Sequence, residues 1–147
     1  MQYDPLVYSA LRAAGWIPGR QAPEALLEVE RLFAASDRPL PDYARAFLAE
    51  FAGVRPRFPN PRQLEVITGI DLGVSPTALS KLALTRFCAE TGEDLCQVGK
   101  GISGSDGFYL LGESGALYWA WENVSRVGQD FAEGLLRMMT EKRPLML

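Results

Sequence analysis

The chain has 147 residues, of which 48% are hydrophobic and 22% are charged, with two cysteines, no histidine and a formal net charge of −3. A chain of this size can bury one sizeable core, which predicts a single globular domain, and its weak acidity leaves no general basic field to hold nucleic acid. The absence of histidine excludes every Ser-His-Asp or Cys-His catalytic arrangement and makes the two cysteines a poor zinc site, so reduced structural thiols and no metal are expected.

The first predicted helix covers residues 5–14, and its inner side is predicted to carry Leu6, Ala10 and Leu11. The helix ends in the stretch "AGWIPGR", where Gly15 fits the left-handed C′ position of a Schellman ending. In that ending the next side chain, here Trp16, packs back onto the last turn at Leu11. We therefore interpret Trp16 as closing the helix over the core, with a ligand-binding role for its side chain as the alternative.

The same stretch closes with Gly19 and Arg20, which are predicted to form a turn into the next segment. A second helix is predicted over residues 23–35, with a proline at its first position. A third is predicted over residues 42–53, with Asp42 as its cap. The side chains expected to face inward are Leu26, Val29, Leu32 and Phe33 in the second helix and Tyr43, Phe47, Leu48 and Phe51 in the third.

The spacing of apolar residues then changes to the alternation of strands. Residues 54–58 and 63–71 predict two strands, and Pro56 places the first of them at a sheet edge. One face of the second strand is expected to carry Leu64, Val66, Thr68 and Ile70. A helix is predicted next, with Ser75 as its cap and Pro76 as its first residue. Its inward side chains are expected to be Leu79, Leu82, Ala83 and Phe87.

Three further strands are predicted at residues 94–98, 107–112 and 116–121, followed by a closing helix over about 129–141. The segment "GESG" between the last two strands is typical of a hairpin, which joins antiparallel strands. Because helices precede, separate and follow the strands, we predict an α+β fold with a mostly antiparallel sheet of about five to six strands backed by helices. Alternation places Leu117, Trp119 and Trp121 on one face, and we expect both tryptophans to pack in the core. If one of them is instead exposed as an interface anchor, we expect it to be Trp121.

The segment "GKGISG" at residues 99–104 matches the pattern G-x-G-x-x-G of phosphate-binding loops. A dinucleotide site requires a helix directly after this pattern, whereas a strand is predicted here. The strand lysine and H-R-D loop of a kinase are absent, and so is the Lys-Ser/Thr pair of a Walker A motif. We therefore interpret the segment as a connection between two strands and expect no cofactor.

Several stretches together resemble the third family of the SUKH superfamily of immunity proteins. They are "AGWIPGR", "FLAEFAGV", "DLCQVG" and "GFYLLGESGALYW", in this order, followed by the closing helix. The resemblance implies an α+β fold with no catalytic residues and no cofactor. It also implies that the protein binds and neutralises a cognate protein toxin of a polymorphic toxin system, often a nuclease or deaminase. The family usually has an aspartate before the glycine of the last hairpin, where this chain has Glu113 and Gly115.

Acidic side chains are concentrated in one segment, since residues 90–134 hold eight acidic and two basic side chains. A toxin that acts on nucleic acid presents a basic cleft, which is complementary to such a segment. We therefore hypothesise that this part of the chain contacts the toxin through Asp94, Asp106, Glu113, Trp121 and Glu122. Simple solvation of loop ends explains the same charges and is the alternative.

Three other classes of protein remain open. A cytoplasmic adaptor or regulator without a toxin partner fits the same sequence. A small nucleic-acid binder would use arginines interleaved with aromatic rings, namely Arg45, Arg55, Arg57 and Arg62 with Phe51 and Phe58, against the overall acidity. An enzyme with paired carboxylates is the third. The first residues lack the basic start and apolar run of a signal peptide, so we expect a cytoplasmic protein, while the oligomeric state and the role of the tail "PLML" stay open.

Overall fold

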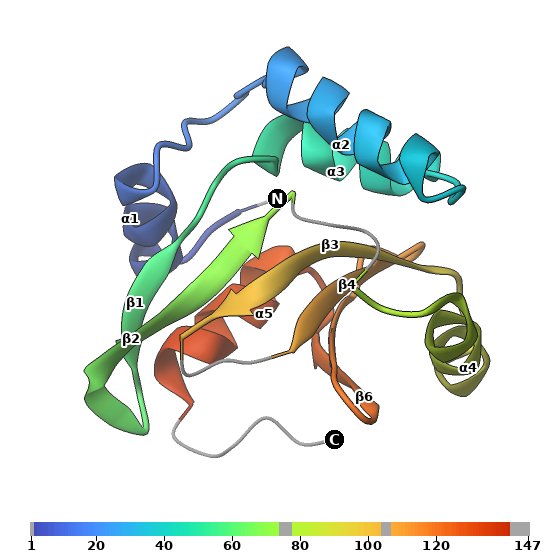
Figure 1. The fold of residues 1–147 in the computed structure, drawn as a ribbon. Coiled ribbons are helices and arrows are strands. Elements are labelled where there is room, and N and C mark those ends of the chain that lie inside the picture. Colours follow the sequence, from blue (N-terminus) through green and yellow to red (C-terminus); the bar gives the residue numbers. More distant parts are fainter. Residues whose placement is uncertain (1, 74–77, 104–106, 142–147) are drawn as a thin grey trace.

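The computed structural model describes residues 2–73, 78–103 and 107–141. Its helices are α1 (Pro5–Ala13), α2 (Pro23–Ala35), α3 (Asp42–Phe51), α4 (Lys81–Thr91) and α5 (Phe131–Thr140). Its strands are β1 (Arg57–Asn60), β2 (Gln63–Leu72), β3 (Leu95–Ile102), β4 (Phe108–Gly112), β5 (Leu117–Ala120) and β6 (Val124–Gly128). They form a 6-stranded sheet in the order β1-β2-β3-β4-β5-β6, and each neighbouring pair is antiparallel. The predicted single-domain α+β fold is confirmed (Figure 1).

Helices cover the two faces of the sheet unequally. On one face, Leu117 packs in a buried cluster with residues of α1, α3 and α5, and Leu111 packs with residues of α2 and α3. On the other face, Leu110 and Tyr118 pack with Phe87 of α4, which stands apart from the other helices (Figure 1). The predicted alternation is therefore confirmed within β5, because Leu117 and Tyr118 belong to clusters on opposite faces. It does not extend to Trp121, which follows the end of β5 and stacks on Phe108, a neighbour of the Tyr118 cluster.

Two parts of the sheet differ from the sequence predictions. β3 continues through residues 99–102, which the sequence assigns to a connection. A Cβ atom at Gly99 would lie 2.8 Å from the backbone oxygen of Asp71 on β2, so this glycine allows two strands to approach closely. Gly104, the last glycine of the pattern, lies outside the described residues. β6 is missing from the sequence prediction because the exposed Arg126 interrupts its apolar alternation.

The ending of α1 is confirmed, and one of its inner residues is corrected. Gly15 has a φ of +96°, and the Trp16 N–H donates to the carbonyl of Leu11 at 3.0 Å, which is the long hydrogen bond of a Schellman ending. Trp16 and Leu11 lie in one buried cluster. Val7 is buried in place of Leu6, because Val7 and Leu11 are four residues apart and share one side of the helix.

Two further side chains predicted to face inward are exposed. Leu64 lies in the first half of β2, where the turn of the β1–β2 hairpin extends away from α2 and α3 (Figure 1). Leu82 lies on the solvent side of α4, whose buried residue is Phe87. Thr68 and Ile70 are buried as predicted, and β1, which follows Pro56, is the edge strand that the proline predicts.

The starts of two helices are also corrected. Asp42 is the first residue of α3, and the cap position belongs to the proline before it. α4 begins after Ser80, whose hydroxyl oxygen accepts a hydrogen bond from a backbone N–H of the first turn at 3.0 Å. The predicted cap Ser75 and first residue Pro76 lie outside the described residues.

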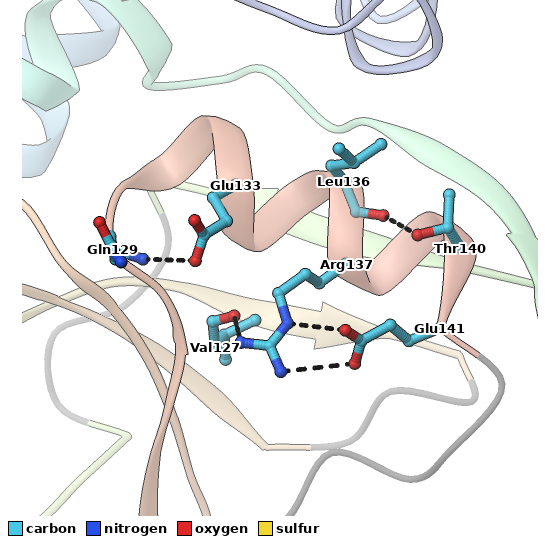
Figure 2. A network of polar contacts seen from close by, with 7 residues as sticks. All are labelled: Val127, Gln129, Glu133, Leu136, Arg137, Thr140 and Glu141. Atoms are coloured by element: carbon cyan, nitrogen blue, oxygen red, sulfur yellow. Dashed lines mark hydrogen bonds and ion pairs between the residues drawn. The ribbon is translucent and has the colours of Figure 1, made fainter.

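Polar contacts fix both ends of α5, the predicted closing helix (Figure 2). At its start, the Glu133 N–H donates to Oδ1 of Asp130 at 2.8 Å and the Gln129 N–H donates to Oε1 of Glu133 at 3.1 Å, which is a reciprocal capping arrangement. Near its end, the Arg137 guanidinium donates to the backbone carbonyl of Val127 on β6 at 3.0 Å. This bond ties α5 to the last strand of the sheet.

The orientation of α1 predicts unequal effects of two leucine substitutions. Leu11→Ala is expected to lower the free energy of unfolding by about 2–5 kcal/mol, because it leaves a cavity in the core. Leu6→Ala in the same helix is expected to change it by less than about 0.5 kcal/mol, because Leu6 is 54% exposed. Urea unfolding of the two variants measures the difference, and equal losses would contradict the orientation.

Candidate partner-binding surface

Trp16 and Arg20 attach the connection after α1 to the end of α3. The Arg20 guanidinium donates to the backbone carbonyl of Glu50 and, at 2.9 Å, to that of Ala52. The Trp16 indole N–H donates to Oε2 of Glu50 at 2.8 Å. The last carbonyls of a helix lack partners within it, so Arg20 supplies donors where the helix cannot. From the sequence alone Arg20 is predicted only to lie in a turn, because its partners lie 30 and 32 residues further along the chain.

Aromatic rings surround Trp16, which is 2% exposed. The rings of Tyr3 and Tyr8 meet it edge to face, with centroids at 5.3 and 5.7 Å, and Phe51 stacks on it at 6.1 Å. Gly19 completes the connection with a φ of +76°. The motif residues that the sequence singled out, Gly15, Trp16, Gly19 and Arg20, thus form one structural unit at the junction of α1 and α3.

Two of the predicted contact residues, Asp94 and Glu113, lie side by side. The Glu113 N–H donates to the backbone carbonyl of Asp94 at 3.0 Å, and both residues are exposed. They occupy the end of the sheet where β3 begins and β4 turns into β5. Asp130 follows β6 at this same end, because Gly128 of β6 pairs with Leu117 at the start of β5. We call Asp94, Glu113 and Asp130 the acidic end.

A carboxylate beneath the β4–β5 turn holds that turn in place. Glu93 accepts hydrogen bonds from the Ser114 N–H at 2.8 Å and from the Tyr118 hydroxyl at 2.5 Å. Burial raises the pKa of Glu93, but these hydrogen bonds outweigh it and leave the pKa below its ordinary value. Burial, followed by the bond to Glu93, raises the pKa of Tyr118 to about 12. The hydrogen bonds of Glu93 therefore stabilise the β4–β5 turn, which contains Glu113.

Trp121 and Glu122 lie at the other end of β5, so the structure separates them from Asp94 and Glu113. The Trp121 side chain is 54% exposed, so the expected core packing is wrong for this residue and the alternative choice of Trp121 is confirmed. Its ring stacks on Phe108 with centroids 5.8 Å apart. The backbone carbonyl of Glu122 accepts a hydrogen bond from Arg86 of α4. Asp106 lies outside the described residues. The described members of the predicted set therefore fall into two groups, one at each end of a strand of 4 residues.

Both cysteines are free, and Cys96 is buried. Burial raises the pKa of both thiols, that of Cys96 to about 12, so they stay protonated and unreactive at neutral pH. Across residues 2–73, 78–103 and 107–141, no group of three or more His, Cys, Asp or Glu residues is arranged to hold a metal ion. Within the same ranges no helix has the length and apolar character needed to cross a membrane.

The chain matches a known protein family. Residues 3–141 match the family model described as SUKH-3 immunity protein. This range contains every helix and strand of the described structure. No curated protein and no solved structure matches the chain.

The bonds to Glu93 predict how stability depends on pH. A pKa lowered by folding contributes stability that is present above the ordinary value, about 4.3, and is lost as the pH falls through the lowered value. Tyr118→Phe removes one bond, so we expect it to lower the free energy of unfolding by about 1 kcal/mol at about pH 7 and by less at acid pH. Tyr8→Phe, at an exposed tyrosine, is the control and should show no such trend. A loss for Tyr118→Phe that is the same at both pH values would contradict the role of Glu93.

Proposed function

The chain belongs to the SUKH-3 immunity protein family, and we propose that it protects its cell by binding a cognate toxin and occluding the toxin's working surface. The observation that carries this proposal is the family match over residues 3–141. We propose further that it acts in the bacterial cytoplasm as part of a polymorphic toxin system, that its whole length serves as one immunity domain, and that it has no catalytic activity of its own.

The acidic end supports a particular kind of toxin. Asp94 and Glu113 are exposed and lie together, and antiparallel pairing brings Asp130 to the same end. Complementary charge steers the encounter of two proteins and accelerates association. We propose that the toxin acts on nucleic acid, as a nuclease does, and that its basic cleft meets this end. We propose Asp106, which lies outside the described residues, as a further contact of the toxin.

Trp121 and Glu122 supply a second proposed contact. An exposed tryptophan backed by another ring is a typical anchor of an interface, and Phe108 provides that backing for Trp121. The two ends of β5 are about 13 Å apart, because the strand has 4 residues. One side of a standard interface covers about 800 Å², which extends over more than this distance. One toxin domain can therefore cover both ends of β5.

The structure supports protein binding over nucleic-acid binding. Of the arginines that a nucleic-acid site would use, Arg45 forms an ion pair with Glu30 and Arg55 forms one with Asp71 at 3.4 Å. Paired guanidinium groups are less available to phosphates, since binding would first have to break an ion pair. The acidic side chains of residues 90–134 would in addition repel the phosphates of a nucleic-acid backbone.

Affinity capture of the tagged protein from its own cells tests the proposed function. The expected result is one stoichiometric partner, the C-terminal domain of a large secreted protein, which kills cells when expressed alone and spares them when this chain is co-expressed. A tight complex survives washing, because nanomolar complexes dissociate slowly. A captured partner that is harmless alone, or a toxin that stays active in the complex, would contradict the proposal and favour an adaptor.

Charge reversal tests the proposed surface once the toxin is known. Asp94→Lys combined with Glu113→Lys is expected to slow association by about tenfold or more and to flatten its dependence on salt. Glu28→Lys combined with Glu65→Lys makes the same change of net charge at exposed sites elsewhere and is the matched control. Stopped-flow kinetics at several salt concentrations measures both. Equal rates for the two variants would place the interface elsewhere.

A further inference from the structure

A cavity of about 590 Å³ lies between α1, the connection after it and α3. Its size is within the range of about 300–1,000 Å³ that is usual for ligand sites. Aromatic rings dominate its walls, and one carboxylate stands among them; the lining includes Tyr3, Tyr8, Trp16, Phe47, Phe51 and Glu50. The cavity therefore combines the faces and edges of π-systems with a single negative charge.

The charge of Glu50 is not balanced by a neighbouring cation. The Trp16 indole donates a hydrogen bond to the Glu50 carboxylate. Across the described ranges no lysine or arginine lies within ion-pair distance of this carboxylate. Arg20, although close, donates to the backbone carbonyl of Glu50 instead. The indole binds Oε2, which leaves Oε1 as a free acceptor within the described part of the chain. Burial, followed by the negative charges of Glu50 and Asp130, raises the pKa of Tyr3 on the cavity wall.

The cavity adjoins the acidic end of the sheet. Phe47, on its wall, contacts the ring of Phe131 with centroids 5.1 Å apart, and Phe131 directly follows Asp130. One turn earlier on α3, the Tyr43 hydroxyl donates to Oδ2 of Asp94 at 2.8 Å. α3 thus runs from the acidic end to the cavity, so a partner seated on one reaches the other.

We propose that this cavity receives an arginine side chain of the toxin, which stacks on the aromatic wall and donates to Glu50. The proposal rests on the proposed function. A guanidinium is planar, stacks on aromatic faces and donates two parallel hydrogen bonds to a carboxylate, so it matches both features of the cavity. A guanidinium already lies on an aromatic ring within this chain, because the Arg12 guanidinium lies over the Tyr8 ring, 5.9 Å from its centroid.

A titration without toxin tests the cavity directly. The ¹⁵N-labelled chain is titrated with N-acetyl-arginine methylamide, and the indole N–H resonance of Trp16 is followed by NMR. The citrulline analogue, which has nearly the same shape and no charge, is the matched probe. We expect the Trp16 indole and the Gly19 amide to shift in a saturable way with the arginine probe and to respond at least about tenfold more weakly to citrulline.

Variants assign the binding to the cavity. Glu50→Gln is expected to weaken binding of the arginine probe by about tenfold or more. Glu28→Gln, at an exposed site on α2, is expected to leave the affinity for the probe unchanged. If Glu50→Gln fails to fold, Tyr8→Leu at the cavity rim gives the same test. Equal responses to both probes, an unmoved Trp16 resonance, or binding that survives both cavity variants would overturn the proposal. Since no toxin is used, these results are independent of whether the captured partner is a toxin.

Discussion

The structure depends on the attachment of the connection after α1 to the end of α3. Arg20 satisfies backbone carbonyls that α3 itself cannot pair, and Trp16 closes α1 while its indole holds Glu50. Trp16 also lies in the buried cluster that joins α1, α3, α5 and the sheet. Two separate stretches that carry the family resemblance, "AGWIPGR" and "FLAEFAGV", therefore meet in space, and their contact sets the position of both helices.

Local chemistry explains which features the sequence could predict. The ending at Gly15 and the bounds of α2 depend on residues a few positions apart, so both could be predicted. The missed features depend on distant partners. Arg20 donates to carbonyls at the end of α3, and Gly99 is required by the close approach of the β2 backbone. Leu64 is exposed because its part of the β1–β2 hairpin extends beyond α2 and α3. For the candidate site, the sequence identified acidic residues of one segment, but only the register of the sheet places Asp94 beside Glu113 and away from Trp121.

Antiparallel topology gathers charge in a way that composition cannot show. Every second turn returns the chain to the same end of the sheet, so residues from the starts and ends of several strands become neighbours there. The acidic end arises in this manner. Glu50 joins the same region from outside the acidic segment, because α3 crosses from Asp94 to the aromatic cavity. In this member of the SUKH-3 immunity protein family, the proposed contact surface thus combines acidic side chains with an aromatic recess.

Hydrogen exchange of the complex with its toxin tests most directly where the partner binds. Amides of the connection between α1 and α2 and of the turn between β4 and β5 should exchange more slowly in the complex, because a bound partner restricts the opening of the backbone that it covers. The β1–β2 hairpin should exchange at the same rate in the free and bound states. Slower exchange confined to that hairpin or to α4 would contradict the account, since neither contributes to the acidic end or to the cavity beside it.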